Sequence, residues 1–255
     1  MILDFHTHYT PGLKEEMRRC GVSKAVVMFM KRDLYSPDGR LNYATPEEIS
    51  DETKRLYEEG VVGDADFIPF LWWNSRMPDA VETAEKHFRK GFRGLKLHPV
   101  VDNYDIRKAE EQELLHELIG CAIRHRVPVM VHTGWLPQGS VYAVADLAER
   151  FPEGKFVIAH MKEEYGINPR MSHIEVARKH ENIYLECSYV EHSRRIRQAV
   201  SAIGSGRVLY GSDFPLGGDA MMEESMAKVR WAKISEKEKE DVLGNSAARL
   251  LGMLE

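Results

Sequence analysis

The sequence predicts an α/β fold, a single-domain (β/α)8 TIM barrel, because short apolar runs alternate with helical patterns along all 255 residues. Eight apolar runs are continuous rather than alternating in polarity, as expected for strands buried on both faces of a parallel sheet. They cover residues 2–5, 25–30, 67–72, 94–97, 127–131, 156–159, 183–187 and 207–210. No linker rich in proline, glycine or serine divides the chain, so we expect one domain over residues 1–255. An open doubly wound sheet is the alternative, but the G-x-G-x-x-G fingerprint that it often carries is absent after the first strand.

Amphipathic patterns predict helices between these strands. Residues 45–48 (TPEE) have the form of a capping box, with Thr45 as N-cap and Gly60 as C-cap of the helix that follows. Apolar stripes at helical spacing lie within residues 81–88, 114–123, 144–151 and 196–203. From Ser235 onward we expect two short helices joined near Gly244 and Asn245.

Composition and charge exclude several classes of protein. The net charge is −5 with both signs spread along the chain, and no basic tract suggests a nucleic-acid partner. The three cysteines are scattered without a CxxC pair, which disfavours a disulfide framework or a thiolate zinc site. No signal-peptide pattern is visible, and the longest apolar runs are too short to cross a bilayer. We therefore expect a cytoplasmic protein with no membrane partner.

Histidines gather where the predicted strands end. Of eleven histidines, five lie at or just after strand ends, and Asp213 follows the last strand: the histidines are His6, His8, His98, His132 and His160. In a barrel of this kind the chemistry lies at the carboxyl ends of the strands. One such histidine alone is more often a hydrogen-bonded polar residue, and Asp213 alone has the form of a helix N-cap. Their joint placement favours a site for a divalent metal.

Imidazole nitrogens and a carboxylate oxygen suit Zn²⁺, and to a lesser degree Mn²⁺ or Fe²⁺. With one coordination position open, such a metal lowers the pKa of a bound water to roughly 7, and a nearby carboxylate can take the proton during attack.

Six segments together resemble the amidohydrolase superfamily, and most closely its amidohydrolase-2 group of metal-dependent hydrolases and decarboxylases. They are DFHTH at 4–8, GLKLHP at 94–99, VHTG at 131–134, AH at 159–160, GSDFP at 211–215 and NSAARLL at 245–251. The polymerase-and-histidinol-phosphatase group also opens with D-x-H-x-H, but its late motif typically runs GSDAH, whereas Phe214 and Pro215 follow Asp213 here.

The resemblance implies roles for particular residues. His6, His8, His132 and Asp213 would hold one divalent ion, most simply Zn²⁺ with Mn²⁺ as the alternative. Asp213 would also accept a proton, and His160 would hydrogen-bond the attacking water or polarise the scissile carbonyl. Some relatives hold a second metal through a carboxylated lysine on the fourth strand, which is the position of Lys96.

The implied function is a metal-dependent hydrolase that uses a zinc-activated water to attack a lactone, an amide or a related carbonyl. A non-oxidative decarboxylase of the same family is the alternative, although many of those enzymes carry E-x-H or A-x-H where this chain has His6 and His8. A phosphoesterase of the polymerase-and-histidinol-phosphatase type and a non-catalytic metal-binding barrel also remain open. A homodimer is expected only from the family.

Loops after the strands are expected to shape the pocket for a small-molecule substrate. The candidate substrate-binding residues are Lys96, His98, Trp72 and Arg76, with Tyr189 and His192 as further candidates at the rim. One of the adjacent residues Trp72 and Trp73 is expected in the core and the other in the pocket. The longest loop, at residues 31–44, is a candidate lid. Four basic residues near the expected mouth suggest an anionic substrate: Lys31, Arg32, Arg76 and Lys162.

Overall fold

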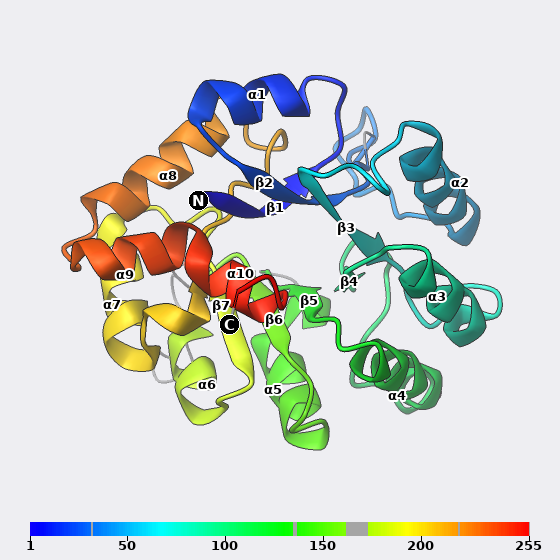
Figure 1. Cartoon of the computed structure of the whole chain (residues 1–255). Coiled ribbons are helices and arrows are strands. Elements are labelled where there is room, and N and C mark those ends of the chain that lie inside the picture. The colour runs from blue at the N-terminus through cyan, green and yellow to red at the C-terminus, as the bar shows by residue number, and fades with distance from the viewer. Residues whose placement is uncertain (32, 135–136, 162–172, 219, 255) are drawn as a thin grey trace.

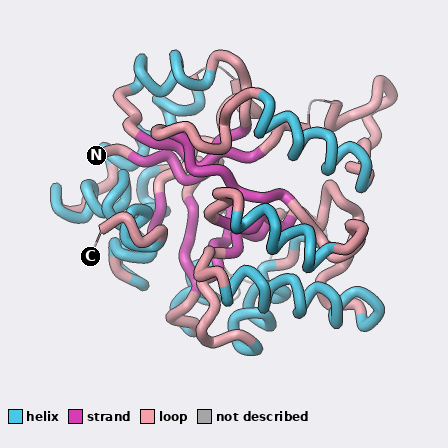
Figure 2. The backbone as a smooth tube through the Cα atoms, turned by 45° about the vertical axis from the view of Figure 1, so that its right-hand side comes forward, coloured by secondary structure: helices cyan, strands magenta, loops and turns pink. Residues whose placement is uncertain are grey.

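The strands form one parallel sheet of eight, ordered as they occur in the sequence (Figures 1 and 2). The computed structural model describes residues 1–31, 33–134, 137–161, 173–218 and 220–254. The strands are β1 (Leu3–His8), β2 (Lys24–Met28), β3 (Phe67–Trp72), β4 (Gly94–Leu97), β5 (Val129–His132), β6 (Phe156–Ala159), β7 (Ile183–Glu186) and β8 (Val208–Leu209). The predicted single-domain (β/α)8 barrel is therefore confirmed.

Helices surround the barrel, and Figure 2 shows the strands inside this ring. They are α1 (Leu13–Cys20), α2 (Pro46–Glu58), α3 (Ala80–Arg89), α4 (Ala109–Arg124), α5 (Val141–Arg150), α6 (His173–Lys179), α7 (Ser193–Ile203), α8 (Met221–Trp231), α9 (Glu236–Glu240) and α10 (Ser246–Leu250). Short 3₁₀ turns η1 (Pro137–Gly139) and η3 (Ser205–Arg207) and a π-helical turn η4 (Asp241–Asn245) connect some of them. No helix in the described part of the chain combines the length and apolar character that a bilayer crossing requires.

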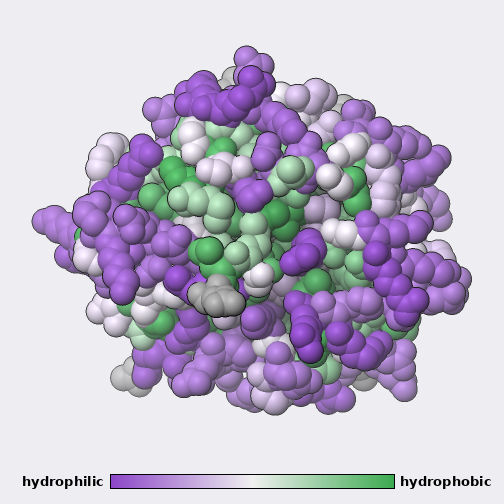
Figure 3. Space-filling view, viewed as in Figure 1, coloured by the Kyte–Doolittle hydropathy of each residue, from purple (hydrophilic) through white to green (hydrophobic). Residues whose placement is uncertain are grey.

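The C-terminal helices close the end of the barrel at which the strands begin (Figure 1). Ala247, Leu250 and Leu251 join the core inside the barrel, together with Phe5 and Phe70. In the same view, Figure 3 shows hydrophobic residues near the middle of this face and hydrophilic residues around its periphery. The apolar plug leaves only the opposite end of the barrel interior for polar chemistry.

One local prediction, the capping box at residues 45–48, is corrected. Thr45 does accept a hydrogen bond from the Glu48 N–H (3.2 Å), but the expected return bond is replaced because the Glu48 carboxylate pairs with Lys31 (2.8 Å). Gly60 follows the helix in the left-handed conformation (φ +71°), as a C-cap glycine should. The complete capping box lies instead at Ser235 and Glu238. Helices α1, α6 and α8 were not predicted from the sequence.

The first strand is longer than its apolar run and includes His6 and His8. A register shift between Asp4 and Thr7 interrupts its pairing with β2. Phe5 packs edge-on against Phe70 in the barrel interior, with ring centroids 5.5 Å apart, while His6 and His8 both line the cavity above. A shift of this kind re-aims side chains, so neighbouring residues can serve the apolar plug and the polar site.

The residues after β8 close the sheet against β1. The Phe5 N–H donates to the Tyr210 carbonyl (2.8 Å), the Asp213 N–H to the His6 carbonyl (2.7 Å), and the His8 N–H to the Phe214 carbonyl (2.8 Å). Closure therefore places Asp213 directly beside the two histidines of β1.

Gly94→Ala on β4 should destabilise the barrel. A Cβ at this position would overlap the buried Phe70 ring, and overpacking of a core typically costs about 1–3 kcal/mol. Urea denaturation measures the free energy of unfolding. Gly206→Ala is the control, because its Cβ meets no heavy atom within 4 Å. Equal stability of the two variants would contradict the packing described here.

Candidate metal centre and active site

A cavity of about 310 Å³ opens at the carboxyl ends of the strands. Its polar lining comes from strand ends and the residues that follow them: His6, His8, Lys96, His98, His132, His160 and Asp213. Its apolar lining comes mostly from loops after β2, β4 and β8: Leu34, Tyr35, Leu41, Val100, Val101 and Leu216. The site thus combines a polar set of possible ligands with apolar walls.

Three acceptor atoms converge at the centre of the polar set. The Asp213 Oδ1 lies 3.0 Å from His6 Nε2 and 3.1 Å from His8 Nε2. The other nitrogen of each ring faces an oxygen that only accepts: His8 Nδ1 lies 2.6 Å from the Phe29 carbonyl, and His6 Nδ1 lies 3.0 Å from Glu186 Oε2. Each neutral ring therefore carries its proton on Nδ1 and turns the lone pair of Nε2 toward Asp213.

This donor set fits a divalent cation. Two imidazole lone pairs and a carboxylate oxygen repel one another unless a positive charge lies among them, and these are ligands that Zn²⁺ or Mn²⁺ accepts. Although burial opposes it, the neighbouring His6 and His8, when His6 carries a positive charge, hold the pKa of Asp213 well below its usual range. Burial lowers the pKa of His6, but Asp213 and Glu186 outweigh it and raise that pKa above its ordinary value. Without a cation, a proton on His6 relieves the repulsion.

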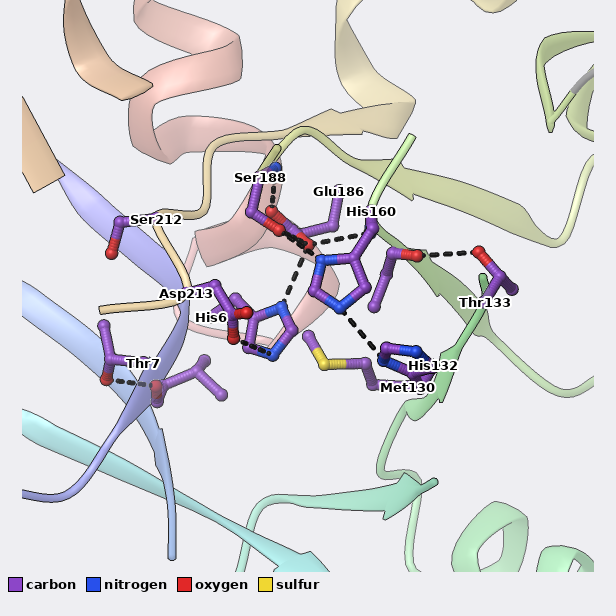
Figure 4. Close-up of polar contacts among 12 residues, drawn as sticks. His6, Thr7, Met130, His132, Thr133, His160, Glu186, Ser188, Ser212 and Asp213 are labelled. Carbon is purple, nitrogen blue, oxygen red and sulfur yellow. Dashed lines mark hydrogen bonds and ion pairs between the residues drawn. The ribbon is translucent and has the colours of Figure 1, made fainter. Parts of the chain in front are cut away.

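His132 and His160 face each other beside this trio (Figure 4). His132 Nδ1 lies 3.0 Å from His160 Nε2, and the His160 ring stacks on His6 with centroids 5.0 Å apart. Among the described residues, the tight groups of possible ligand atoms are His6–His8–Asp213 and His6–His160–Glu186, neither of which includes His132. The role of His132 as a fourth ligand thus stays a prediction.

Glu186 and Ser188 are polar residues of the site that the sequence did not single out. Glu186 is fully buried at the end of β7, between His6 and His160 (Figure 4). The Ser188 Oγ lies 2.7 Å from His160 Nδ1 and donates to Glu186 Oε2 (2.8 Å). In the sequence, Glu186 could have been noticed as a carboxylate at the end of an apolar strand, but it belongs to none of the motifs.

Three residues of the site adopt left-handed backbone conformations: His160 (φ +64°), Tyr189 (φ +56°) and Asp213 (φ +61°). They follow β6, β7 and β8, where the chain turns away from the barrel. Such conformations cost non-glycine residues of order 1 kcal/mol or more, so the surrounding hydrogen bonds must enforce them. Tyr189 also hydrogen-bonds Asp213, and burial is the main cause of its raised pKa.

Four aromatic rings form a continuous stack beside His6, His8 and Asp213: Phe29, Trp72, His98 and His132. Successive centroids lie 4.4, 4.9 and 3.9 Å apart. The Trp72 Nε1–H donates to the buried Asp102 carboxylate (3.0 Å), while Trp73 packs in the core, as the sequence predicted for one of this pair. The Val101 N–H donates to His98 Nδ1 (3.2 Å), so neutral His98 carries its proton on Nε2. Burial holds the pKa of His98 well below its usual value and keeps it neutral.

Lys96 lies at the bottom of the cavity, fully buried, with Nζ 3.5 Å from His6 Nε2. Burial lowers its pKa to about 8, although Asp213, Glu186 and Asp102 act in the opposite direction. Lys96 is thus the cation placed nearest to the ligand set among the described lining residues.

The other predicted cations contribute less to the cavity. Lys31 lines it, but Lys31 Nζ pairs with Asp33 (2.6 Å) and Glu48 (2.8 Å). The Arg76 guanidinium donates to the Asn103 carbonyl (2.8 Å), and Arg76 is absent from the described cavity lining. Arg32 and Lys162 lie outside the described residues, and His192 caps α7 away from the lining.

The chain belongs to the amidohydrolase family, whose model matches residues 3–253. It is therefore an enzyme of the metal-dependent amidohydrolase superfamily, as its motifs predicted. The family match over nearly the whole chain outweighs the phosphoesterase likeness, which rested on the first residues alone. No curated protein matches the chain significantly.

Solved structures with the same fold include decarboxylases and a hydrolase. 5-Carboxyvanillate decarboxylase from Sphingomonas paucimobilis is 13% identical with TM-score 0.72, and the match covers 99% of each chain. A dihydroxybenzoic acid decarboxylase from Polaromonas sp., with bound manganese and the inhibitor 2-nitroresorcinol, is 14% identical with TM-score 0.74, covering 99% of this chain and 97% of that one. A probable 2-pyrone-4,6-dicarboxylic acid hydrolase from Acinetobacter baumannii is 12% identical with TM-score 0.67, covering 98% of this chain and 99% of that one. At these identities the likeness shows the fold alone.

Divalent metal should stabilise the folded protein. Adding Zn²⁺ or Mn²⁺ to chelator-treated protein at about 100 times its Kd should contribute about 2.7 kcal/mol and raise Tm by about 5–10 °C, because the ion binds the folded site. Asp213→Ala should abolish this increase. Asp38→Ala, which removes a half-exposed carboxylate of the loop after β2, should retain it. An unchanged Tm in the parent protein would refute the metal centre.

Proposed function

We propose that the protein is a metal-dependent hydrolase that attacks a lactone, amide or related carbonyl of a small substrate, with Zn²⁺ as its resident ion. The observation that carries this proposal is the convergence of two imidazole lone pairs and the Asp213 carboxylate at the cavity base. His6, His8 and Asp213 would hold the ion, with His132 as the fourth ligand. When bound, such an ion supplies Lewis acidity, which polarises a carbonyl and makes hydroxide available near neutral pH.

The protein's own residues then accept and hold protons during the reaction. Asp213 is a buried carboxylate with a low pKa that faces the reaction position and accepts a proton from the attacking water. His160 keeps its proton on Nδ1, facing Ser188, so its Nε2 carries the lone pair. In this structure that lone pair accepts the His132 Nδ1–H (3.0 Å), and in the reaction it would accept a hydrogen bond from water in place of His132. Both groups line the cavity and would serve as acceptors there.

Substrate recognition is assigned to Lys96, His98, Trp72 and Arg76. Neutral His98 offers an Nε2–H donor to a carbonyl or hydroxyl oxygen, and Lys96 offers a cation to a carboxylate or phenolate. Arg76 would contribute indirectly, because its guanidinium hydrogen-bonds the backbone of the loop that carries Asp102. The apolar loops accommodate a compact unsaturated body, so the substrate carries its anionic group toward Lys96.

Non-oxidative decarboxylation of an aromatic or unsaturated acid is the second candidate. The observation in its favour is the apolar cavity wall with a buried cation at its base, which suits a ring bearing one carboxylate. Four of the solved structures with the same fold carry decarboxylase names, which agrees with this candidate.

A substrate panel separates these reactions. Metal-loaded protein is incubated with lactones, amides, hydroxybenzoic acids and unsaturated carboxylic acids, and ring opening, ammonia and CO₂ are measured. Ring opening or ammonia release is the expected outcome. Release of CO₂ alone would show that the reaction is decarboxylation rather than hydrolysis. If no product forms with Zn²⁺ or Mn²⁺, the proposed activity fails.

His160→Gln should lower kcat by about 10²–10⁴-fold, because a positioned proton acceptor contributes that much to catalysis. Its metal content should match that of the parent protein, since His160 is not assigned as a ligand. Metal content is measured by elemental analysis of the same samples. Complete loss of the ion from this variant at saturating Zn²⁺ would show that His160 is a ligand instead.

His98→Phe should raise KM and lower kcat/KM by about tenfold, because the variant keeps a ring in the aromatic stack but loses one hydrogen-bond donor to substrate. Steady-state kinetics on the substrate found in the panel tests this. Unchanged kinetics would remove His98 from the binding residues.

A further inference from the structure

We infer that Glu186 is a positioning residue that fixes the proton positions of three histidines in the site, and that it does so through a one-directional hydrogen-bond chain. The inference rests on the metal site of the proposed function and adds to it the residue that orients its ligands. Glu186 lies in none of the motifs that identify the family in this sequence.

Glu186 receives hydrogen bonds from several groups inside the barrel. Its Oε2 lies 3.0 Å from His6 Nδ1, 3.1 Å from the His160 backbone nitrogen and 2.8 Å from Ser188 Oγ. Its Oε1 accepts from the Ser188 backbone N–H. The side chain is fully buried, so it is shielded from bulk solvent.

The proton positions follow from the acceptor at the end of the chain. A carboxylate only accepts hydrogen bonds, so the Ser188 hydroxyl donates its one proton to the bond with Glu186. Ser188 Oγ must then accept from His160 Nδ1, which lies 2.7 Å away. His160 Nε2 is left with a lone pair and accepts from His132 Nδ1 (3.0 Å). Each hydrogen bond thus fixes the direction of the next.

Two branches of hydrogen bonds lead from Glu186 to predicted metal ligands, one directly to His6 and one through Ser188 and His160 to His132. On both branches the ligand carries its proton on Nδ1 and its lone pair on Nε2. On the direct branch, the Nδ1 proton of His6 points at Glu186 and its Nε2 lone pair faces Asp213. On the branch through Ser188 and His160, the Nδ1–H of His132 donates to His160, so neutral His132 carries its lone pair on Nε2. One carboxylate therefore places the lone pair on Nε2 of the predicted ligands His6 and His132. It does the same for His160, the predicted proton acceptor between them.

A second metal ion held by Glu186, His6 and His160 is the competing explanation, because these residues form the other tight group of ligand atoms. The donors around Glu186 oppose it. Both oxygens already accept N–H or O–H donors, two of them from the backbone, and these protons occupy the positions that a cation would need.

The barrel provides a dedicated place for this carboxylate. Gly211, just after β8, lies against Glu186, and a Cβ at that position would overlap the carboxylate and its Cγ. The chain just after β8 thus has no side chain where the carboxylate lies, which leaves room for Glu186 beside the histidines.

Glu186→Gln tests the inference. The amide keeps the shape but loses the charge, and its NH₂ group must face either the Ser188 N–H or His6 Nδ1–H, where a donor meets a donor. We expect the Kd for Zn²⁺, measured by competition with a chromophoric chelator, to rise about 10–100-fold, as for other residues that orient metal ligands. Asp241→Asn is the matched control: it converts a nearly buried carboxylate bound to Ser205 and Arg249, remote from the cavity, and should leave that Kd unchanged.

Proton positions are read directly by NMR of ¹⁵N-histidine-labelled, metal-free protein, with His6 and His160 assigned from their own variants. The parent protein should show the proton of neutral His160 on Nδ1. Ser188→Ala keeps the carboxylate and should convert His160 to a mixture of tautomers, which provides the test if Glu186→Gln fails to fold.

The outcomes separate the inference from the function it rests on. If the parent protein binds no Zn²⁺, the proposed function fails. If it binds one ion per chain and Glu186→Gln binds it equally well, or if Ser188→Ala leaves the His160 tautomer unchanged, the inference is overturned. Two ions per chain in the parent and one in Glu186→Gln would overturn it in favour of the second metal.

Discussion

The hydrogen bond from the Asp213 N–H to the His6 carbonyl, at 2.7 Å, is the contact on which the site depends. It belongs to the seam where the last strand closes against the first. Closure places a carboxylate from one end of the chain against two imidazoles from the other end. Because backbone groups make this contact, its geometry is independent of the side chains that it brings together.

The site concentrates groups that would not associate in isolation. Two histidine lone pairs face one carboxylate, and left-handed backbone turns at His160 and Asp213 add conformational cost. The apolar plug formed in part by Phe5 and Phe70 compensates for this polar cluster, because its close packing holds the strands in register beneath it. A bound cation would convert the convergence of acceptors from a cost into an interaction that stabilises the fold.

The direction of hydrogen bonding matters as much as the distances. Glu186, the Phe29 carbonyl and the Val101 N–H each face one nitrogen of a histidine and thereby decide what the other nitrogen offers. His6 and His8 present lone pairs, whereas His98 presents a donor. The same side chain thus offers a lone pair or a hydrogen-bond donor to the cavity according to the partner behind it.

The sequence by itself determined the barrel, since continuous apolar runs alternating with amphipathic segments admit few other folds, and it placed His6, His8 and Asp213 at strand ends. The tertiary structure alone decided what no local pattern encodes. It placed Glu186 behind His6, paired Lys31 with Asp33 and Glu48, and turned Arg76 toward backbone carbonyls rather than into the cavity lining. The physical reason is that periodicity reports which face of an element is buried, whereas proton positions and charge pairing depend on atoms contributed by other strands.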